Sequence, residues 1–158
     1  MEKQKVYIET SVISYLASKP SRDIIVAGQQ LITKQWWDNH RNKYQLYVSD
    51  LVIKEASAGD KIASEIRLQY LNNIMLLEVD EKVINLSKNL METGIIPKKA
   101  IEDSIHISVA TINEIDYLLT WNCKHIANAV IYKQLRRIIA NYGYELPTLC
   151  TPNELLSE

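Results

Sequence analysis

The feature that most constrains the fold is an alternation of short apolar runs with longer segments of helical periodicity. The runs are rich in β-branched and aromatic residues, as buried strands are. They cover residues 5–9 (KVYIE), 44–49 (YQLYVS), 74–78 (IMLLE), 116–121 (DYLLTW) and 147–150 (PTLC). This alternation indicates an α/β domain whose mainly parallel sheet has roughly five strands.

Helical patterns fill the segments between these runs. A long helix is predicted over residues 24–36, and two helices hinged near Gly59 are predicted over residues 50–71. Further helices are predicted over residues 83–91, 100–112 and 130–142. The segment 100–112 carries two adjacent stripes of apolar or small residues, so its helix must be packed on two sides. No linker or repeat divides the chain, which predicts a single domain over residues 1–158.

The composition excludes several classes of function. A net charge of −1 argues against a protein that grips nucleic acid or membranes through bulk positive charge. Only four glycines are present, too few for a glycine-rich phosphate loop. Two cysteines without CxxC spacing fit a reducing compartment, and no signal peptide or membrane-spanning run is recognised. We therefore expect a cytoplasmic protein with no membrane contact.

Polar residues stand where the predicted strands end. Glu9 closes the first run, Glu55 lies a few residues past the second, and Asn122 follows the fourth. Asp103 lies near the start of the doubly apolar helix. The carboxyl ends of parallel strands meet at a crevice, where these side chains are expected to converge. Crowded carboxylates repel one another unless a cation neutralises them, and Mg²⁺ or Mn²⁺ prefers oxygen ligands. The three histidines share no metal-ligand spacing, so only oxygen ligands are expected.

Each of these residues also has an ordinary structural explanation. Glu55 fits an exposed helix residue, and Asp103 fits a first-turn acid favoured by the helix dipole. Asn122 fits a turn or capping residue, and His106 a half-buried polar residue one turn after Asp103. Glu9 is harder to explain in this way, because a carboxylate that ends an apolar strand is costly to bury without a partner.

Three segments carry a resemblance to a known family. They are VYIETSVISYL (residues 6–16), IEDSIHISVAT (101–111) and DYLLTWNCKHIAN (116–128), with Glu55 between them. Together they resemble PIN-domain proteins, and among these the VapC-type toxins of type II toxin–antitoxin pairs. The resemblance implies a three-layer α/β/α sandwich around a parallel sheet. It also implies an acidic cluster that binds Mg²⁺ or Mn²⁺ and hydrolyses phosphodiester bonds in RNA.

The resemblance assigns roles to the four polar residues. Glu9, Glu55 and Asp103 match the family's metal ligands, and Asn122 matches its fourth catalytic position. Two positions depart from the family pattern. The first acid is usually Asp, whereas Glu9 is one methylene longer. The fourth residue is commonly Asp, whereas Asn122 is neutral, which favours a single tightly held metal.

The expected reaction needs no nucleophilic side chain. One or two divalent ions would orient and deprotonate a water for in-line attack on a backbone phosphate, with Thr10 and Ser11 as supporting residues. Basic residues near the crevice are candidate contacts for the substrate's phosphates. They are Lys98, Lys99, Lys124 and His125. Solvated surface charge explains each of these four equally well.

The resemblance also implies partners, namely an RNA substrate, a small antitoxin protein and a second copy of the chain in a homodimer. Trp36 and Trp37 are adjacent, so either one of them covers a protein contact or both cap a broad edge of the core. Three functions stay open. The chain is an RNA-cutting toxin, a PIN-like domain that has lost efficient catalysis and binds RNA or protein, or a DNA-directed nuclease. Nothing in the sequence visibly reads a 2′-hydroxyl group.

Overall fold

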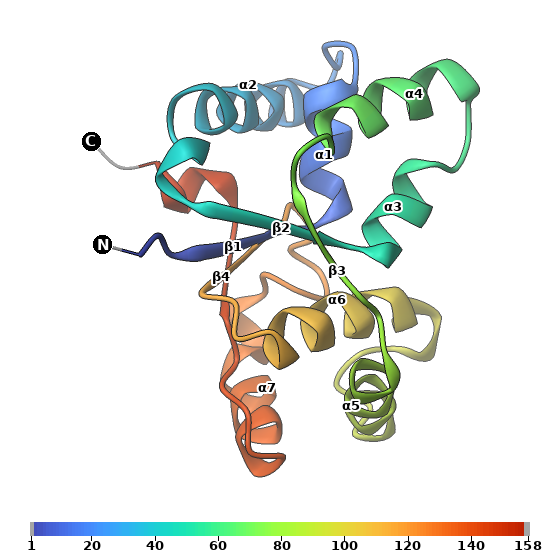
Figure 1. Cartoon of the computed structure of the whole chain (residues 1–158), viewed down its shortest axis with the longest axis vertical. Coiled ribbons are helices and arrows are strands. Elements are labelled where there is room, and N and C mark those ends of the chain that lie inside the picture. Colours follow the sequence, from blue (N-terminus) through green and yellow to red (C-terminus); the bar gives the residue numbers. More distant parts are fainter. Residues whose placement is uncertain (1, 157–158) are drawn as a thin grey trace.

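The structure, a computed structural model, describes residues 2–156 (Figure 1). The strands are β1 (Lys5–Ile8), β2 (Gln45–Ser49), β3 (Met75–Leu77), β4 (Tyr117–Leu119) and β5 (Thr148–Cys150). The α-helices are α1 (Thr10–Ala17), α2 (Ile24–Asn39), α3 (Asp50–Ala56), α4 (Lys61–Tyr70), α5 (Glu81–Glu92), α6 (Ile101–Ile112) and α7 (Ala129–Asn141). Short 3₁₀ turns are η1 (Arg41–Lys43), η2 (Lys98–Ala100) and η3 (Pro152–Leu155). Within residues 2–156, no helix has the length and apolar character needed to cross a membrane.

The five strands form one parallel sheet with β1 at its centre. The strand order is β3-β2-β1-β4-β5, which confirms the predicted five-stranded sheet. Val6 of β1 pairs with Leu46 of β2 on one side and with Tyr117 of β4 on the other. The chain therefore builds outward through β2 and β3, and then returns across β1 to build β4 and β5. In such sheets ligands bind beyond the carboxyl ends of the strands where the order reverses, here β1 and β4.

Helices cover both faces of the sheet and complete the predicted three-layer sandwich. In Figure 1, α1 to α4 lie above the sheet and α5 to α7 lie below it. Most helices begin at a side chain that accepts a hydrogen bond from a backbone N–H of the first turn. These capping residues are Asp23, Ser49, Asp60, Asp80 and Asn128. Gly59 has a φ of 84° between α3 and α4, and this confirms the predicted hinge.

Helix α6 is packed on two sides, as its double stripe predicts. Ser104 and all residues from 106 to 111 are buried. One side meets α5, where the hydroxyl oxygens of Ser87 and Ser104 lie 2.6 Å apart. The other side meets the sheet, where His106 Nδ1 lies 2.7 Å from the hydroxyl oxygen of Tyr7 in β1. A helix buried in this way can hold a polar side chain inside the sandwich.

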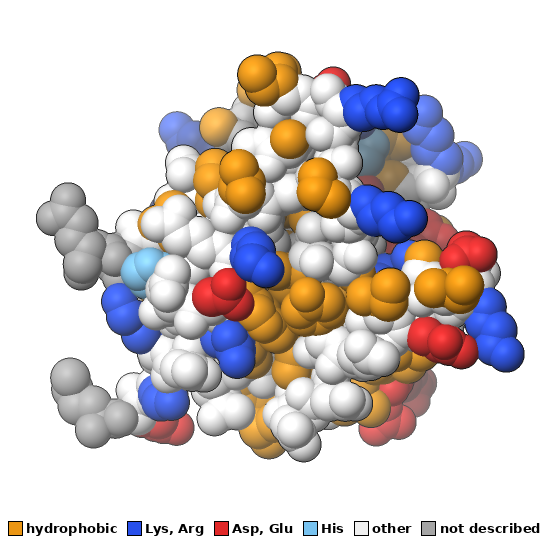
Figure 2. All heavy atoms as spheres, turned by 90° about the horizontal axis from the view of Figure 1, so that it is seen from above, with side chains coloured by type: hydrophobic (Ala, Val, Ile, Leu, Met, Phe, Trp, Pro, Cys, Tyr) orange, Lys and Arg blue, Asp and Glu red, His pale blue; other side chains and the backbone are white. Residues whose placement is uncertain are grey.

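The layer above the sheet leaves large apolar residues exposed. The pattern over residues 24–36 correctly predicts helix α2, but Ile24, Ile25 and Leu31 do not face the core. Ile24 is 86 % exposed, and Ile62 of α4 is exposed as well. Figure 2 views this layer from outside and shows apolar side chains gathered between scattered lysines and arginines. Helical periodicity therefore identifies the helix here without identifying the face that packs on the sheet.

The adjacent tryptophans of α2 have different environments. Trp36 is fully buried and stacks on Tyr44, with ring centroids 6.0 Å apart. Trp37 is half-buried and meets the ring of Tyr70 edge-on. The guanidinium carbon of Arg41 lies 5.0 Å from the centroid of the Trp37 ring. Trp36 thus belongs to the core and Trp37 to its rim.

Cys150 of β5 provides a test of burial in the core. Burial, with a smaller contribution from the charge of Glu154, raises the pKa of this thiol from 9.0 to about 12. Below pH 9 the Cys150 thiol is protonated in both states, and its contribution to the free energy of unfolding is complete. This contribution is lost as the pH rises toward 12, because only the unfolded thiol ionises in that window. We expect Cys150→Ala to flatten the alkaline fall in the free energy of unfolding, measured by urea denaturation. An unchanged fall would contradict the assigned burial.

The exposed thiol of Cys123 should react with iodoacetamide in the native protein, and the buried thiol of Cys150 only in urea.

Candidate active site

Glu9 stands directly after β1 and is held by two hydroxyl groups. Its Oε1 accepts a hydrogen bond from Ser11 Oγ at 2.5 Å and another from Thr120 Oγ1 at 2.6 Å. The residue is only 6 % exposed, and its backbone N–H donates to the Leu119 carbonyl at 3.0 Å. The structure thus places Glu9 at the end of β1 and beside the end of β4, where the sequence predicts it. The two hydroxyl groups offset part of the cost of burying its charge.

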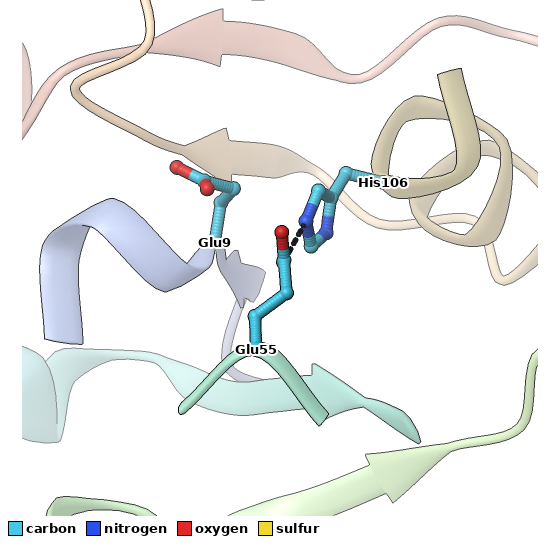
Figure 3. Close-up of side chains that lie close together, drawn as sticks. All are labelled: Glu9, Glu55 and His106. Carbon is cyan, nitrogen blue, oxygen red and sulfur yellow. Dashed lines mark hydrogen bonds and ion pairs between the residues drawn. The ribbon is translucent and has the colours of Figure 1, made fainter. Parts of the chain in front are cut away.

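Glu55 reaches the same crevice from α3. Its Oε1 accepts a hydrogen bond from Thr10 Oγ1 at 2.7 Å and forms an ion pair with His106 Nε2 at 2.6 Å. Figure 3 shows the side chains of Glu55 and His106 directed at one another. Burial raises the pKa of Glu55, but the hydrogen bond and charge of His106 and the hydrogen bond of Thr10 lower it more. Because the pKa lies below its ordinary value, Glu55 is ionised at neutral pH.

His106 is the site residue that the sequence does not reveal. It is expected to be half-buried, yet it is 1 % exposed because α6 is covered on both sides. Burial lowers the pKa of His106, whereas the hydrogen bond to Glu55 and the charges of Glu9, Glu55 and Asp103 raise it more. The signal available in the sequence is its position three residues after Asp103, which places both on neighbouring parts of one helix face.

Asp103 and Asn122 lie close enough to influence each other. Asp103 is half-buried in the first turn of α6. Burial raises the pKa of Asp103, and the hydrogen bond from the Asn122 side chain and the charges of His106 and His125 offset only part of this. Asn122 Oδ1 also accepts a hydrogen bond from the backbone N–H of His125 at 3.0 Å. Asn122 therefore has the turn-forming role that its type suggests and also lies near the predicted acid.

A groove of about 500 Å³ opens beside these residues. Glu55 lines it from α3, and Asp103 lines it from α6. Lys54, which the sequence does not single out, also lines the groove from the position before Glu55. The groove is thus lined by both acidic and basic side chains.

Of the four basic residues that are predicted to contact phosphates, only some line the groove. Lys99 and His125 line it, as predicted. Lys98 and Lys124 are exposed neighbours of these two residues in the chain and lie outside the lining. The structure therefore brings two of the four basic residues to the groove itself.

The donor atoms at the crevice fit a divalent cation. Glu9, Glu55 and His106 each bring one ligand atom within 4.8 Å of the others. In both glutamates Oε1 is held by two donors, and no residue from 2 to 156 donates a hydrogen bond to Oε2. Two restrained carboxylates, each with one open oxygen, suit Mg²⁺ or Mn²⁺. Asp103 lies outside this group of three, beside Asn122.

No family model and no curated protein matches the sequence. In structure, the chain is similar to one from VapBC2 of Rickettsia felis bound to a DNA fragment from their promoter. The TM-score is 0.55 at 16 % identity, over 94 % of this chain and 98 % of that chain. The chain is also similar to VapC20 of Mycobacterium tuberculosis, a sarcin-ricin loop cleaving toxin. Here the TM-score is 0.55 at 12 % identity, over 76 % of this chain and 92 % of that chain. The protein therefore has the PIN-domain fold of the VapC toxins.

Proposed function

We propose that the protein is a metal-dependent endoribonuclease and the toxin of a type II toxin–antitoxin pair, formed by a single domain over residues 1–158. The observation that carries this proposal is the pair of restrained carboxylates, Glu9 and Glu55, at the carboxyl edge of a PIN-type sheet. The likeness in fold to VapC20, a sarcin-ricin loop cleaving toxin, supports RNA as the substrate. Mg²⁺ or Mn²⁺ is the cofactor that carboxylate oxygens favour.

The acidic residues would hold the cation and would be held in turn by their neighbours. Glu9, Glu55 and Asp103 are the proposed ligands. The hydroxyls of Ser11 and Thr10 support this arrangement, since they donate to Glu9 and Glu55 respectively. When bound, the cation supplies Lewis acidity at the scissile phosphate and activates a water for in-line attack.

Asn122 has a different task from the three acids. Its side chain lies near enough to Asp103 to lower the pKa of that carboxyl, and its Oδ1 accepts from the backbone that follows β4. From this place it would help to orient Asp103. We assign Asn122 to the site as a neutral residue that orients Asp103, in place of a further negative ligand.

The basic residues of the groove would guide the RNA backbone. Lys54, Lys99 and His125 line the groove beside the carboxylates. Phosphate contacts of this kind position a nucleic acid without reading its sequence. Lys98 and Lys124, exposed next to Lys99 and His125, would extend the contact. Because the net charge of the chain is only −1, such local contacts and the bound cation would carry the affinity.

We also propose a small antitoxin protein and a second copy of the chain as partners. The likeness in fold to a chain of VapBC2 supports an antitoxin partner. The exposed apolar residues of α2 and α4 provide surface that a protein partner would cover (Figure 2).

Cleavage of a structured RNA by the purified protein tests the proposed activity. Mn²⁺ should support cleavage, and EDTA should abolish it. Asp103→Asn should slow cleavage about 10²–10³-fold, because weakening cation and transition-state binding costs several kcal/mol. Glu65→Gln, an exposed carboxylate on α4, is the matched control and should cleave like the wild type.

Two outcomes would replace the proposed activity with another. Equal background cleavage by the wild type and Asp103→Asn would favour a catalytically silent PIN-like domain that binds RNA or protein. Faster cleavage of a DNA of the same sequence would indicate a DNA-directed nuclease at the same site.

A further inference from the structure

A buried chain of hydrogen bonds lies behind Glu55. His106 Nε2 is 2.6 Å from Glu55 Oε1, and His106 Nδ1 is 2.7 Å from the hydroxyl oxygen of Tyr7. The Tyr7 hydroxyl is in turn 2.8 Å from Ser49 Oγ. His106, Tyr7 and Ser49 are all essentially inaccessible to solvent. The chain of contacts therefore links a groove carboxylate to the interior of the sandwich.

These hydrogen bonds begin and end on α3, the helix that carries Glu55, and so form a closed ring with it. Ser49 caps the N-terminus of α3 by accepting a hydrogen bond from Val52 N at 3.4 Å. Glu55 lies on the same helix, two turns or less from this cap. The carboxylate at one end of α3 is thus tied through His106 and Tyr7 to the cap at the other end. Such a ring restrains both the helix and the rotamer of Glu55.

The hydrogen bonds are satisfied for either charge state of the imidazole. An ionised Glu55 only accepts, so His106 Nε2 must carry the proton. In the neutral ring, Nδ1 accepts from Tyr7, and Tyr7 accepts from Ser49. In the charged ring, Nδ1 donates to Tyr7, and Tyr7 donates to Ser49. In both cases Nε2 donates to Glu55, so the partners in this bond do not depend on the charge of the ring, although the charged ring binds more strongly.

The arrangement leaves His106 no free nitrogen for a cation. Both ring nitrogens are engaged, one by Glu55 and one by Tyr7. His106 and Thr10 together occupy Oε1 of Glu55, which lines the groove, and no residue from 2 to 156 donates a hydrogen bond to its Oε2. Ser11 and Thr120 occupy Oε1 of Glu9 in the same manner. The two carboxylates are thus held alike, because in each of them Oε1 accepts two hydrogen bonds.

We propose that His106 is a positioning residue that fixes Glu55 so that only its Oε2 meets a divalent cation, with Tyr7 and Ser49 holding the imidazole in turn. This proposal rests on the metal-dependent function proposed above. It assigns His106 to the support of a ligand and not to the ligands themselves. Removal of a residue that hydrogen-bonds to a metal ligand typically weakens metal binding 10–100-fold.

Mn²⁺ binding to the RNA-free protein, measured by isothermal titration calorimetry, tests the proposal without reference to activity. His106→Leu should weaken Mn²⁺ binding about 10–100-fold. His106→Gln places an amide N–H near the position of Nε2 and should recover most of that loss. Tyr7→Phe, one step further from the groove, should weaken binding to a smaller extent. Ser104→Ala is the matched control. Ser104 lies on α6 like His106, and its substitution breaks a buried hydrogen bond to Ser87 of α5, so Mn²⁺ affinity should be unchanged.

The outcomes separate the two proposals. A wild-type protein that binds no Mn²⁺ overturns the proposed metal-dependent function, and with it the role of His106. A wild type that binds Mn²⁺ while His106→Leu binds equally well overturns the role of His106 alone. The same holds if Ser104→Ala weakens binding as much as His106→Leu, since the effect would then be general destabilisation.

A spectroscopic signature checks the bond to Glu55 in the metal-free protein. Proton–nitrogen NMR of the wild type should show a protected imidazole N–H assigned to Nε2 of His106. Glu55→Gln should shift this resonance, because the charged acceptor of the hydrogen bond is lost. A His106 ring with its proton on Nδ1 alone would overturn the assigned arrangement, even if Mn²⁺ affinity responds as expected.

Discussion

Glu9→Gln is expected to slow Mn²⁺-dependent RNA cleavage about 10²–10³-fold, the rate being measured under single-turnover conditions. The substitution removes the charge of a buried carboxylate whose Oε2 receives no hydrogen bond from residues 2–156. The amide oxygen of Gln still accepts from Ser11 and Thr120, so the fold should be retained. The unfolding midpoint in EDTA should therefore match that of the wild type, while the stabilisation by Mn²⁺ should shrink. Cleavage at the wild-type rate would exclude Glu9 from the reaction.

Glu9→Asp is the informative companion of this variant. It keeps the charge but withdraws the carboxylate by one methylene from the hydroxyls of Ser11 and Thr120. A displacement of about 1 Å can cost 10²-fold in rate, so we expect a clear loss that remains smaller than that of Glu9→Gln. Full activity of Glu9→Asp would show that the longer side chain is not required by this crevice.

Trp36→Ala is expected to lower the free energy of unfolding by about 3–5 kcal/mol, the usual cost of truncating a large core aromatic. Trp36 is fully buried and stacks on Tyr44. No residue from 2 to 156 accepts a hydrogen bond from its indole N–H, so the loss comes from packing and from the cavity left behind. Since a domain is typically stable by about 5–15 kcal/mol, this single change removes a large share of the total. Urea denaturation followed by circular dichroism measures it.

Trp37→Ala provides the neighbouring control. Trp37 is half-buried at the rim, where it meets Tyr70 and Arg41. Its truncation should cost clearly less than that of Trp36, because solvent fills much of the space that the ring leaves. A larger loss for Trp37 than for Trp36 would contradict the assignment of Trp36 to the core.

Much of the fold is predictable because the sheet is covered on both faces. Central parallel strands read as continuous apolar runs, as residues 5–8 do, and such runs are distinct from helical patterns. The strand predicted over residues 5–9 follows from this contrast, and β1 covers Lys5–Ile8. Some acidic residues of the candidate site, though not Asp103, can be found by looking just beyond the strand ends. Glu9 is predictable in this way, and the structure finds it at the expected edge.

The partners of these carboxylates are not predictable from the sequence. Glu9 meets Thr120 across 111 positions, and Glu55 meets His106 across 51 positions. Periodicity and spacing describe only neighbours along the chain, so neither contact leaves a local trace. His106 therefore resembles any polar residue on an apolar helix until the packing of α6 on β1 is known.

The exposure of α2 shows a second limit of periodicity. Residues such as Ile24 and Leu31 satisfy a helical pattern whether the helix turns them toward its own core or toward solvent. The pattern predicts that the segment is helical, because the 3.6-residue spacing is a property of the helical backbone. Which face is covered depends on the crossing of α1, α2 and α4, and the apolar pattern of α2 alone does not define that crossing.

The central position of β1 has a consequence for when the protein becomes active during its synthesis. Of the five described strands, β1 is synthesised before the others, yet it needs partners on both sides, and β4 begins only at Tyr117. Until Thr120 has emerged, one edge of β1 is unpaired and Glu9 lacks a hydroxyl that holds it. Pairing over such sequence distances is slow, because the chain loses the entropy of loop closure before the stabilising contacts form. The proposed nuclease would therefore gain its ability to cut RNA only after β4 and Thr120 have been synthesised and have paired with β1 and Glu9.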